Sequence, residues 1–223
     1  MTFSIVARTP DAQFFGVAIA SSSPAVAARC AHARAGAGAV ATQNITDPAL
    51  GPTILGSLSQ GGKADAALAA ALGATPFAAY RQVLAVAAQG PPVIHSGARA
   101  LGLVGSAVGT HAAAGGNLLA HIEVPSAMLA AFEAASGHLG SRLLHALRAG
   151  AERGGEAGPV HSAGVLIVRD LSWPIVDLRV DWSDAPVSDL QRIWEIYAPQ
   201  IDAYVQRAID PSRAPGFGVA GDP

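Results

Sequence analysis

The second residue of the chain could combine a nucleophile and its base in one residue. Met1 is followed by Thr2, and a second residue this small permits methionine aminopeptidase to remove Met1. The mature chain would then begin with a threonine that carries both a hydroxyl and a free α-amine. Such an amine has a pKa of about 7.7 to 8.0, so near neutrality it can accept the proton of this weak nucleophile. The alternative is an ordinary first strand in which Thr2 is simply a good β-former.

Two further pairs of polar residues stand at the ends of predicted strands and could complete such a site. Ser21 and Ser22 follow the second strand, and Gln43 and Asn44 end a short buried strand. Polar side chains at these junctions serve either as site residues or as loop residues bonded to their own backbone, and both interpretations stay open. If the first two strands pair, the serines lie near one end of that hairpin, but the pairing register does not follow from the sequence.

The hydrophobic pattern predicts the strands and helices that must position these residues. Phe3, Ile5 and Ala7 alternate with more polar neighbours and indicate a strand at the start of the chain. Asp47 is expected to cap the first helix, with Pro48 at its first position. This order favours an α+β arrangement, antiparallel sheet with helices packed outside. The predicted strands cover residues 1–8, 14–20, 39–43, 83–87, 93–96, 162–168 and 175–182, the predicted helices 50–59, 64–72, 125–135, 140–149 and 187–207, and residues 97–116 are expected to be irregular strand and loop.

Composition favours one large domain that associates with copies of itself. The chain has 223 residues and 51% of them are hydrophobic, which is enough for one substantial core. We assign residues 1–207 to this domain and the Pro- and Gly-rich residues 208–223 to a flexible tail. Charged residues make up 13%, about half the typical share, which leaves little charge to cover the surface of a monomer. We therefore expect a homo-oligomer with apolar interfaces.

Charge and hydropathy argue against several classes of partner. With a net charge of −2 and no basic run, the chain is not expected to bind nucleic acid. Its apolar stretches are interrupted before they reach the roughly 18 residues that a membrane span needs. The N-terminus does not read as a signal peptide either. We expect a cytoplasmic protein that acts on a small molecule.

No motif predicts a metal or a cofactor. Cys30 is the single cysteine, which excludes an internal disulfide and a thiolate metal site. The seven histidines include no His-x-x-x-His pair, and no phosphate-binding glycine loop with a lysine is present. Ser4 would be a second candidate nucleophile if Met1 were retained, but it has no nearby base in the sequence. We expect a site built from hydroxyl, amide and amine groups alone.

Several short segments, each of little weight alone, together resemble a known family. They are MTFSIVA (1–7), GVAIAS (16–21), GAVATQ (38–43), RQ (81–82), GN (116–117), GGE (154–156), SA (162–163) and residues 181–186. In combination they resemble the bacterial domain-of-unknown-function family 1028 over nearly the whole chain up to the last helix. The resemblance implies the N-terminal nucleophile hydrolase fold, a four-layer αββα sandwich. The first hairpin is also similar to that of proteasome β-subunits, where a strand with a terminal threonine is followed by a Gly-Val strand.

The resemblance also implies roles for individual residues. Thr2 would attack a carbonyl, and Ser21 or Ser22 would support its amine. Backbone amides around Gln43 and Asn44 would form an oxyanion hole. Thr2, Ser21 and Gln43 are thus the expected catalytic residues, and the residues expected to bind substrate are Ser22, Asn44, Asn117, Glu156 and Ser162.

Two departures from the related patterns bear on the site. The lysine and aspartate partners of the proteasome threonine have no counterpart here, and Glu156 stands where the family is expected to carry aspartate. We predict an amide-bond hydrolase for a small non-peptide amide or related C–N bond, with Thr2 as nucleophile. The alternative is a protein that kept the fold, lost the chemistry, and binds a small molecule or assembles without turnover.

Overall fold

Two fully buried strands at the start of the chain form the centre of the molecule. In the computed structural model, which describes residues 1–221, β1 (Thr2–Arg8) pairs with β2 (Phe15–Ser21) as an antiparallel hairpin. Phe3 lies opposite Ala20, so the start of β1 and the end of β2 meet at the same end of the hairpin. Because both faces of these strands are buried, the sheet that contains them must be covered on both sides.

The hairpin belongs to a six-stranded antiparallel sheet. Its strand order is β10-β9-β2-β1-β8-β7, where the added strands are β7 (Gly105–Val108), β8 (Ala112–Asn117), β9 (Ser162–Val168) and β10 (Val176–Val180). The stretch expected to be irregular, residues 97–116, contains β7 and all of β8 except its last residue. The small residues of β8 allow another layer to approach closely, since a Cβ added at Gly115 would lie 3.3 Å from the side chain of Leu84.

A second antiparallel sheet has four strands in the order β3-β4-β5-β6. Here β4 and β5 are buried, and their neighbours β3 and β6 form the two edges. The strand β3 was not predicted, nor was the short helix α1 (Val26–Cys30) that precedes it. The four strands are β3 (Ala31–Arg34), β4 (Gly38–Asn44), β5 (Arg81–Ala87) and β6 (Val93–Ser96).

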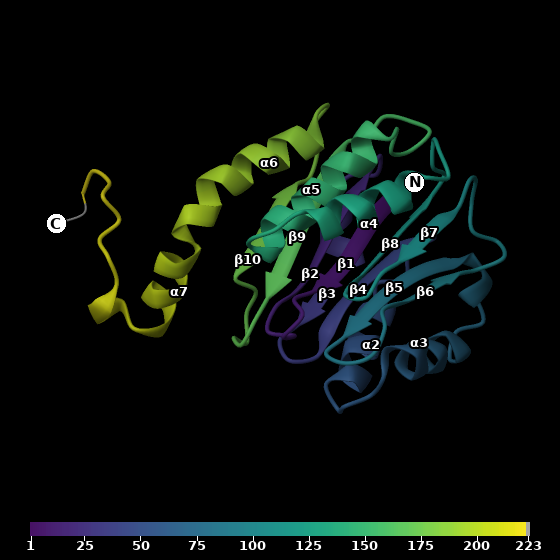
Figure 1. Ribbon diagram of the computed structural model, residues 1–223, viewed down its shortest axis with the longest axis horizontal. Helices are drawn as coiled ribbons and strands as arrows, with labels where there is room; N and C mark the ends of the chain where they lie inside the picture. The colour runs from purple at the N-terminus through teal and green to yellow at the C-terminus, as the bar shows by residue number, and fades with distance from the viewer. Residues whose placement is uncertain (222–223) are drawn as a thin grey trace.

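Helices cover the outer faces of both sheets. Figure 1 shows α4 and α5, the six-stranded sheet, the four-stranded sheet, and α2 with α3 in succession. The sheets face each other across an apolar layer that includes Val6, Val17 and Leu84. The predicted mixture of antiparallel sheets with helices outside them is confirmed. These helices are α2 (Leu50–Leu58), α3 (Ala64–Gly73), α4 (Val124–Ala134) and α5 (Leu139–Glu152).

Alternation along β1 divides its side chains between two environments. Phe3 and Ile5 belong to the core that the six-stranded sheet forms with α4 and α5. Val6 belongs to the layer between the two sheets, and Ser4 bonds there to a residue of β4. Since successive side chains of a strand point to opposite faces, Thr2 also lies on the face between the sheets.

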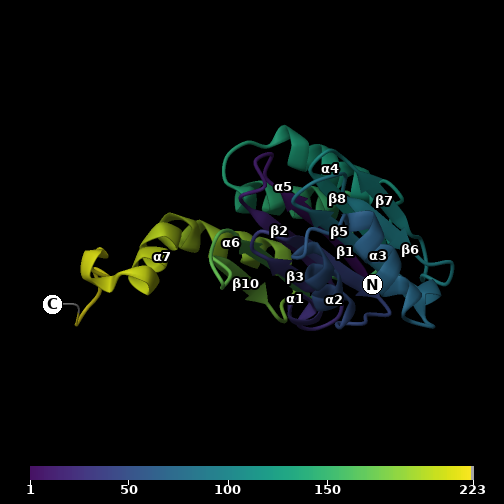
Figure 2. The same ribbon diagram turned by 90° about the horizontal axis from the view of Figure 1, so that it is seen from below.

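The helix predicted over residues 187–207 is interrupted. The structure has α6 (Pro186–Tyr197), a 3₁₀ turn (Ala198–Gln200) and α7 (Ile201–Ile209). Pro199 lies in the turn, and it lacks the backbone N–H that would continue the helical hydrogen bonds. Figures 1 and 2 both show α7 and the following segment directed away from the sheets.

The predicted start of α2 at residue 50 is confirmed, but its predicted cap, Asp47 followed by Pro48 at the first helical position, is wrong. The helix begins at Leu50, and Ala49 occupies the cap position. Asp47 instead accepts a hydrogen bond from the backbone N–H of Ala49 at 3.1 Å, and so closes a turn one step before the helix. The aspartate does organise this junction, but from outside the helix.

The limits of the domain stay a prediction. The proposed boundary at residue 207 falls inside α7, and a 3₁₀ turn (Pro211–Arg213) follows that helix within the predicted flexible tail 208–223. The last two tail residues, 222 and 223, lie outside the described residues. None of the helices formed by residues 1–221 combines the length and apolar character that crossing a membrane requires.

Candidate active site

The hydroxyl groups of Thr2 and Ser21 meet where β1 begins and β2 ends. Their oxygens lie 3.4 Å apart, and both hydroxyls donate to the backbone carbonyl of Met1. Thr2 is only 5% exposed and Ser21 is fully buried. The backbone N–H of Ser23 donates to Ser21 Oγ at 3.1 Å, which holds that hydroxyl in place. The hairpin register therefore places one predicted nucleophile beside its predicted supporting hydroxyl.

A small cavity of about 230 Å³ opens at this pair. Hydroxyl, amide and thiol groups dominate its lining. A larger cavity of about 590 Å³ lies near the Gly38 end of β4, whereas the cavity at Thr2 adjoins the Asn44 end. The small cavity is therefore the one within reach of the Thr2 hydroxyl, and its lining residues are Met1, Thr2, Ser21, Ser23, Val26, Arg29, Cys30, Asn44 and Thr46.

A buried polar network lies behind the cavity, between the two sheets. Ser4 Oγ donates to Gln43 Oε1 at 2.6 Å, and Gln43 Nε2 donates to Gln82 Oε1 at 2.8 Å. Asn117 Nδ2 donates to the same Gln82 oxygen at 3.1 Å. Asn117 lies directly opposite Thr2 in the β1–β8 register, and its Oδ1 has no hydrogen-bond partner within residues 1–221. Gln43 and Asn117 are thus joined through Gln82 of β5, a residue quoted for the family resemblance but not predicted to belong to the site.

Glu156 is buried beside the end of β2 and is only 3% exposed. Its two carboxyl oxygens accept from the backbone N–H of Ser22 at 2.9 and 3.2 Å. Burial raises the pKa of Glu156 to about 7, although the positive charge of the terminal amine, the bonds to Ser22 and the charge of His161 all lower it. Glu156 is thus close enough to the chain terminus for the two charges to interact.

The remaining predicted residues hold the chain around the cavity. Ser162 Oγ donates to the carbonyl of Ser23 at 2.6 Å and accepts from the N–H of Val26 at 3.2 Å, so it fixes the segment between β2 and α1. Asn44 lines the cavity with its backbone in the left-handed region at φ 74°. Its side chain accepts from the N–H of Leu101 at 3.1 Å.

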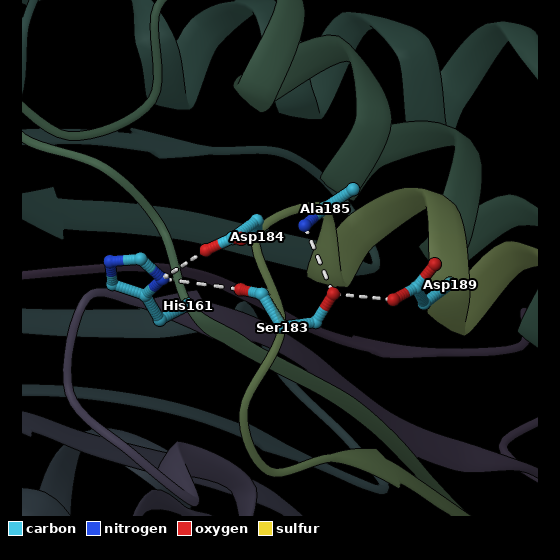
Figure 3. Close-up of polar contacts among 5 residues, drawn as sticks. All are labelled: His161, Ser183, Asp184, Ala185 and Asp189. Carbon is cyan, nitrogen blue, oxygen red and sulfur yellow. Dashed lines mark hydrogen bonds and ion pairs between the residues drawn. The ribbon is translucent and has the colours of Figure 1, made fainter.

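A second polar cluster lies at the start of α6, next to the segment that joins β2 to α1. Figure 3 shows His161 directed at Asp184 and at the carbonyl of Ser183, while Ser183 Oγ lies between Ala185 and Asp189. Ser183 Oγ donates to the Asp189 carboxylate and accepts from the N–H of Ala185, an arrangement typical of a helix start. The imidazole contacts the backbone carbonyl of Ser183 rather than its hydroxyl, so these residues do not form a nucleophile–base pair.

The structure brings together part of the predicted set. Thr2, Ser21 and Asn44 line one cavity. Gln43 and Asn117 lie in the network behind it, and the remaining three predicted residues secure the adjoining loops. Sequence reasoning missed Val26 and four polar or charged lining residues, because the segment from the end of β2 through the short helix α1 and the turn after β4 carry no periodic signal. The four polar or charged residues are Ser23, Arg29, Cys30 and Thr46.

Burial makes Cys30 a poor nucleophile, and no metal group gathers nearby. Burial raises the pKa of the Cys30 thiol, so it stays protonated at neutral pH. Its sulfur lies 3.4 Å from the hydroxyl of Thr46. Across the described part of the chain, no three His, Cys, Asp or Glu side chains are grouped as metal ligands would be. With the thiol protonated, the side chains at the cavity that can attack a carbonyl are the hydroxyls.

The chain matches one family model and a solved structure attributed to the same family. The model of a family of unknown function, DUF1028, matches residues 2–190. A crystal structure of protein SPO2555 from Silicibacter pomeroyi, attributed to the same family, shares 29% sequence identity. The match covers 88% of this chain and 89% of that chain, with a TM-score of 0.81. No curated protein matches the sequence at a significant level.

More distant similarity extends to two other solved structures. Anbu (ancestral beta-subunit) from Yersinia bercovieri is 12% identical, with 91% of this chain and 97% of that chain covered and a TM-score of 0.40. Anbu from Hyphomicrobium sp. strain MC1 is 10% identical, with 92% and 98% covered and a TM-score of 0.40. Similarity at this level carries no information about the reaction.

Proposed function

The chain belongs to the DUF1028 family of unknown function, and we propose that it is an N-terminal nucleophile hydrolase that cleaves a small non-peptide amide or related C–N bond. The supporting observation is the position of the Thr2 hydroxyl, which lies in a small polar cavity at the end of β1, 3.4 Å from Ser21 Oγ. The succession of two helices, two sheets and two helices is compatible with the αββα sandwich of such hydrolases.

In the proposed reaction, removal of Met1 frees the α-amine of Thr2. This amine accepts the hydroxyl proton as Thr2 Oγ1 bonds to the substrate carbonyl carbon. Collapse of the tetrahedral intermediate breaks the C–N bond, and the proton passes to the departing amine. Water then attacks the resulting ester, releases the acid and regenerates the threonine. Nucleophile and base would thus act from a single residue.

The neighbouring residues take supporting roles in this proposal. Ser21 Oγ orients the Thr2 hydroxyl and helps to hold the amine. Backbone N–H groups at Gln43 and Asn44 are the proposed donors to the oxyanion. Pairing of β4 with β3 ends at Ala41, whereas β5 pairs with β4 as far as Asn44. Because successive N–H groups of a strand point to opposite sides, strand pairing leaves free the one of these two that points to the β3 side. Loss of one such donor typically lowers the rate by about 100- to 1000-fold.

Retention of Met1 would favour the alternative of a binding protein without turnover. The Met1 carbonyl engages the hydroxyls of both Thr2 and Ser21, and the Met1 side chain lies against Gly158. While Met1 stays in place, it blocks the amine. A protein that retains Met1 would bind a small molecule without cleaving it.

The test is turnover of an amide library by wild type, Thr2→Ala and Thr2→Ser, with Met1 removal verified for each protein. The serine variant is the matched control, because it keeps a hydroxyl beside the amine. We expect Thr2→Ala to lose more than about a thousandfold in kcat, as loss of a covalent nucleophile typically does, and Thr2→Ser to keep measurable activity. Equal activity of wild type and Thr2→Ala would refute the proposal.

A further inference from the structure

Arg29 is the one charged side chain among the residues that line the cavity at Thr2. It comes from the last turn of α1, and it is exposed. The other lining residues, apart from the chain terminus, offer hydroxyl, amide, thiol and apolar groups. A lone cation at the mouth of a small polar cavity favours an anionic group on whatever enters it.

The Arg29 guanidinium is anchored but not neutralised. Its Nη1 donates to the carbonyls of Pro24 at 2.8 Å and Ala25 at 3.3 Å, which fixes the side chain across the start of α1. Within residues 1–221, no carboxylate pairs with Arg29, and its Nε and Nη2 have no protein hydrogen-bond partner. Guanidinium N–H groups form a planar fork that matches the two oxygens of a carboxylate. The anchored side chain therefore presents free donors without further ordering.

The surrounding charges favour an anion as well. Burial raises the pKa of Cys30, while the positive charges of Arg29 and the terminal amine each lower it. Both cations therefore act on the same wall of the cavity. The nearby carboxyl of Glu156 accepts from the backbone of Ser22 and does not line the cavity. Glu156 interacts with the terminal amine, whereas no carboxyl group at the lining offsets Arg29.

We propose that Arg29 binds a carboxylate of the substrate, so that the site takes small amides that carry a carboxylate. This rests on the proposed function and names its substrate class. The cavity measures about 230 Å³ while Met1 lines it, below the roughly 300 to 1,000 Å³ usual for drug-sized ligands, and the loss of Met1 enlarges it; we expect a compact substrate. The carboxylate would hold that molecule at the rim while its amide carbonyl reaches Thr2.

Binding is tested in the Thr2→Ala background, where cleavage cannot consume the probe, on protein shown by intact mass to lack Met1. The probes are N-acetylglycine and its neutral analogue N-acetylglycinamide, titrated by calorimetry or by amide NMR shifts. With Arg29 present we expect the carboxylate to bind at least about tenfold more tightly. Arg29→Gln should reduce this preference to within about twofold, and Arg29→Lys, which keeps the charge without the fork, should restore part of it.

Arg34→Gln is the matched control, because Arg34 is also exposed but does not line this cavity. It should leave the preference unchanged. Equal binding of the two probes, no binding of either, or a preference that survives Arg29→Gln would each overturn the proposal. A preference that survives Arg29→Gln would indicate that the terminal amine, rather than Arg29, binds the carboxylate. The two proposals can fail separately, because Thr2→Ala measures binding without cleavage. If Thr2→Ala prefers the carboxylate probe but wild type cleaves no amide, the hydrolase proposal is refuted and the role of Arg29 in binding stands.

Discussion

Glu156 is a buried carboxyl that lies near the terminal amine and the imidazole of His161. The terminal amine and His161 both favour its ionised form, as do the bonds from Ser22, yet burial outweighs them and raises its pKa to about 7. The folded protein thus holds this proton more tightly than the unfolded chain, in which the pKa is near 4.5. Its contribution to stability is fully present below about pH 4.5 and is lost as the pH rises through about 7.

The variant Glu156→Gln has no carboxyl group to titrate at this position, so its stability should lack this pH dependence. We expect Glu156→Gln to gain stability relative to wild type between pH 5 and pH 8, by on the order of 1 to 3 kcal/mol. Urea unfolding of both proteins across this range measures the difference. Glu152→Gln, which alters an exposed glutamate of α5, should show no comparable trend. A stability difference between Glu156→Gln and wild type that does not change with pH would contradict this assignment.

Among the elements, β4, β5 and β8 are joined by three buried amide side chains. Gln82 of β5 accepts from both Gln43 and Asn117, and its Nε2 donates to Ser96 Oγ at 3.0 Å and to the carbonyl of Gly116 at 3.1 Å. One side chain therefore connects the two sheets behind the candidate site. Polar groups buried this deeply depend on one another, because each lost partner leaves another group unsatisfied.

Gln82→Leu should accordingly destabilise the fold although the new side chain is apolar. It leaves the amides of Gln43 and Asn117 without their shared acceptor, and we expect a loss of about 2 to 4 kcal/mol in the free energy of unfolding. Denaturant titration measures it. The exposed Gln89 provides the matched substitution, and Gln89→Leu should change stability by less than about 0.5 kcal/mol. Equal stability of the two variants would mean that the network contributes nothing to holding the sheets.

At the scale of the whole molecule, the pattern of apolar residues predicted most of the elements and few of the site contacts. Alternation in β1 and β10 and helical periodicity in α4 and α5 are strong signals, because each element turns an apolar face toward the core. The segment from α1 to β3 gave none, since five helical and four strand residues are too few to show a period.

The candidate site was predictable in part for a related reason. Thr2 and Ser21 carry recognisable chemistry, and pairing of the first two strands was expected. Gln82 is one polar residue in an apolar strand, and Arg29 is one arginine in a short helix, so neither differs in sequence from a structural residue. Their importance arises from the packing of one sheet against the other, which no local pattern records.

The homo-oligomer expected from the low charge content stays a prediction. Several large apolar side chains are exposed, among them Ile196 in α6 and Ile209 in α7. Ile209 is the last residue of α7, the helix that Figures 1 and 2 show directed away from the sheets.

The intact mass of the untagged protein, expressed in bacterial cytosol, tests the central proposal most directly. Thr2 can act as nucleophile and base only if its amine is free, so Met1 must be absent from the active form. We predict a mass lower than that of the full chain by one methionine residue. A full-length mass would show that the amine is blocked, and would contradict the assignment of Thr2 as a terminal nucleophile.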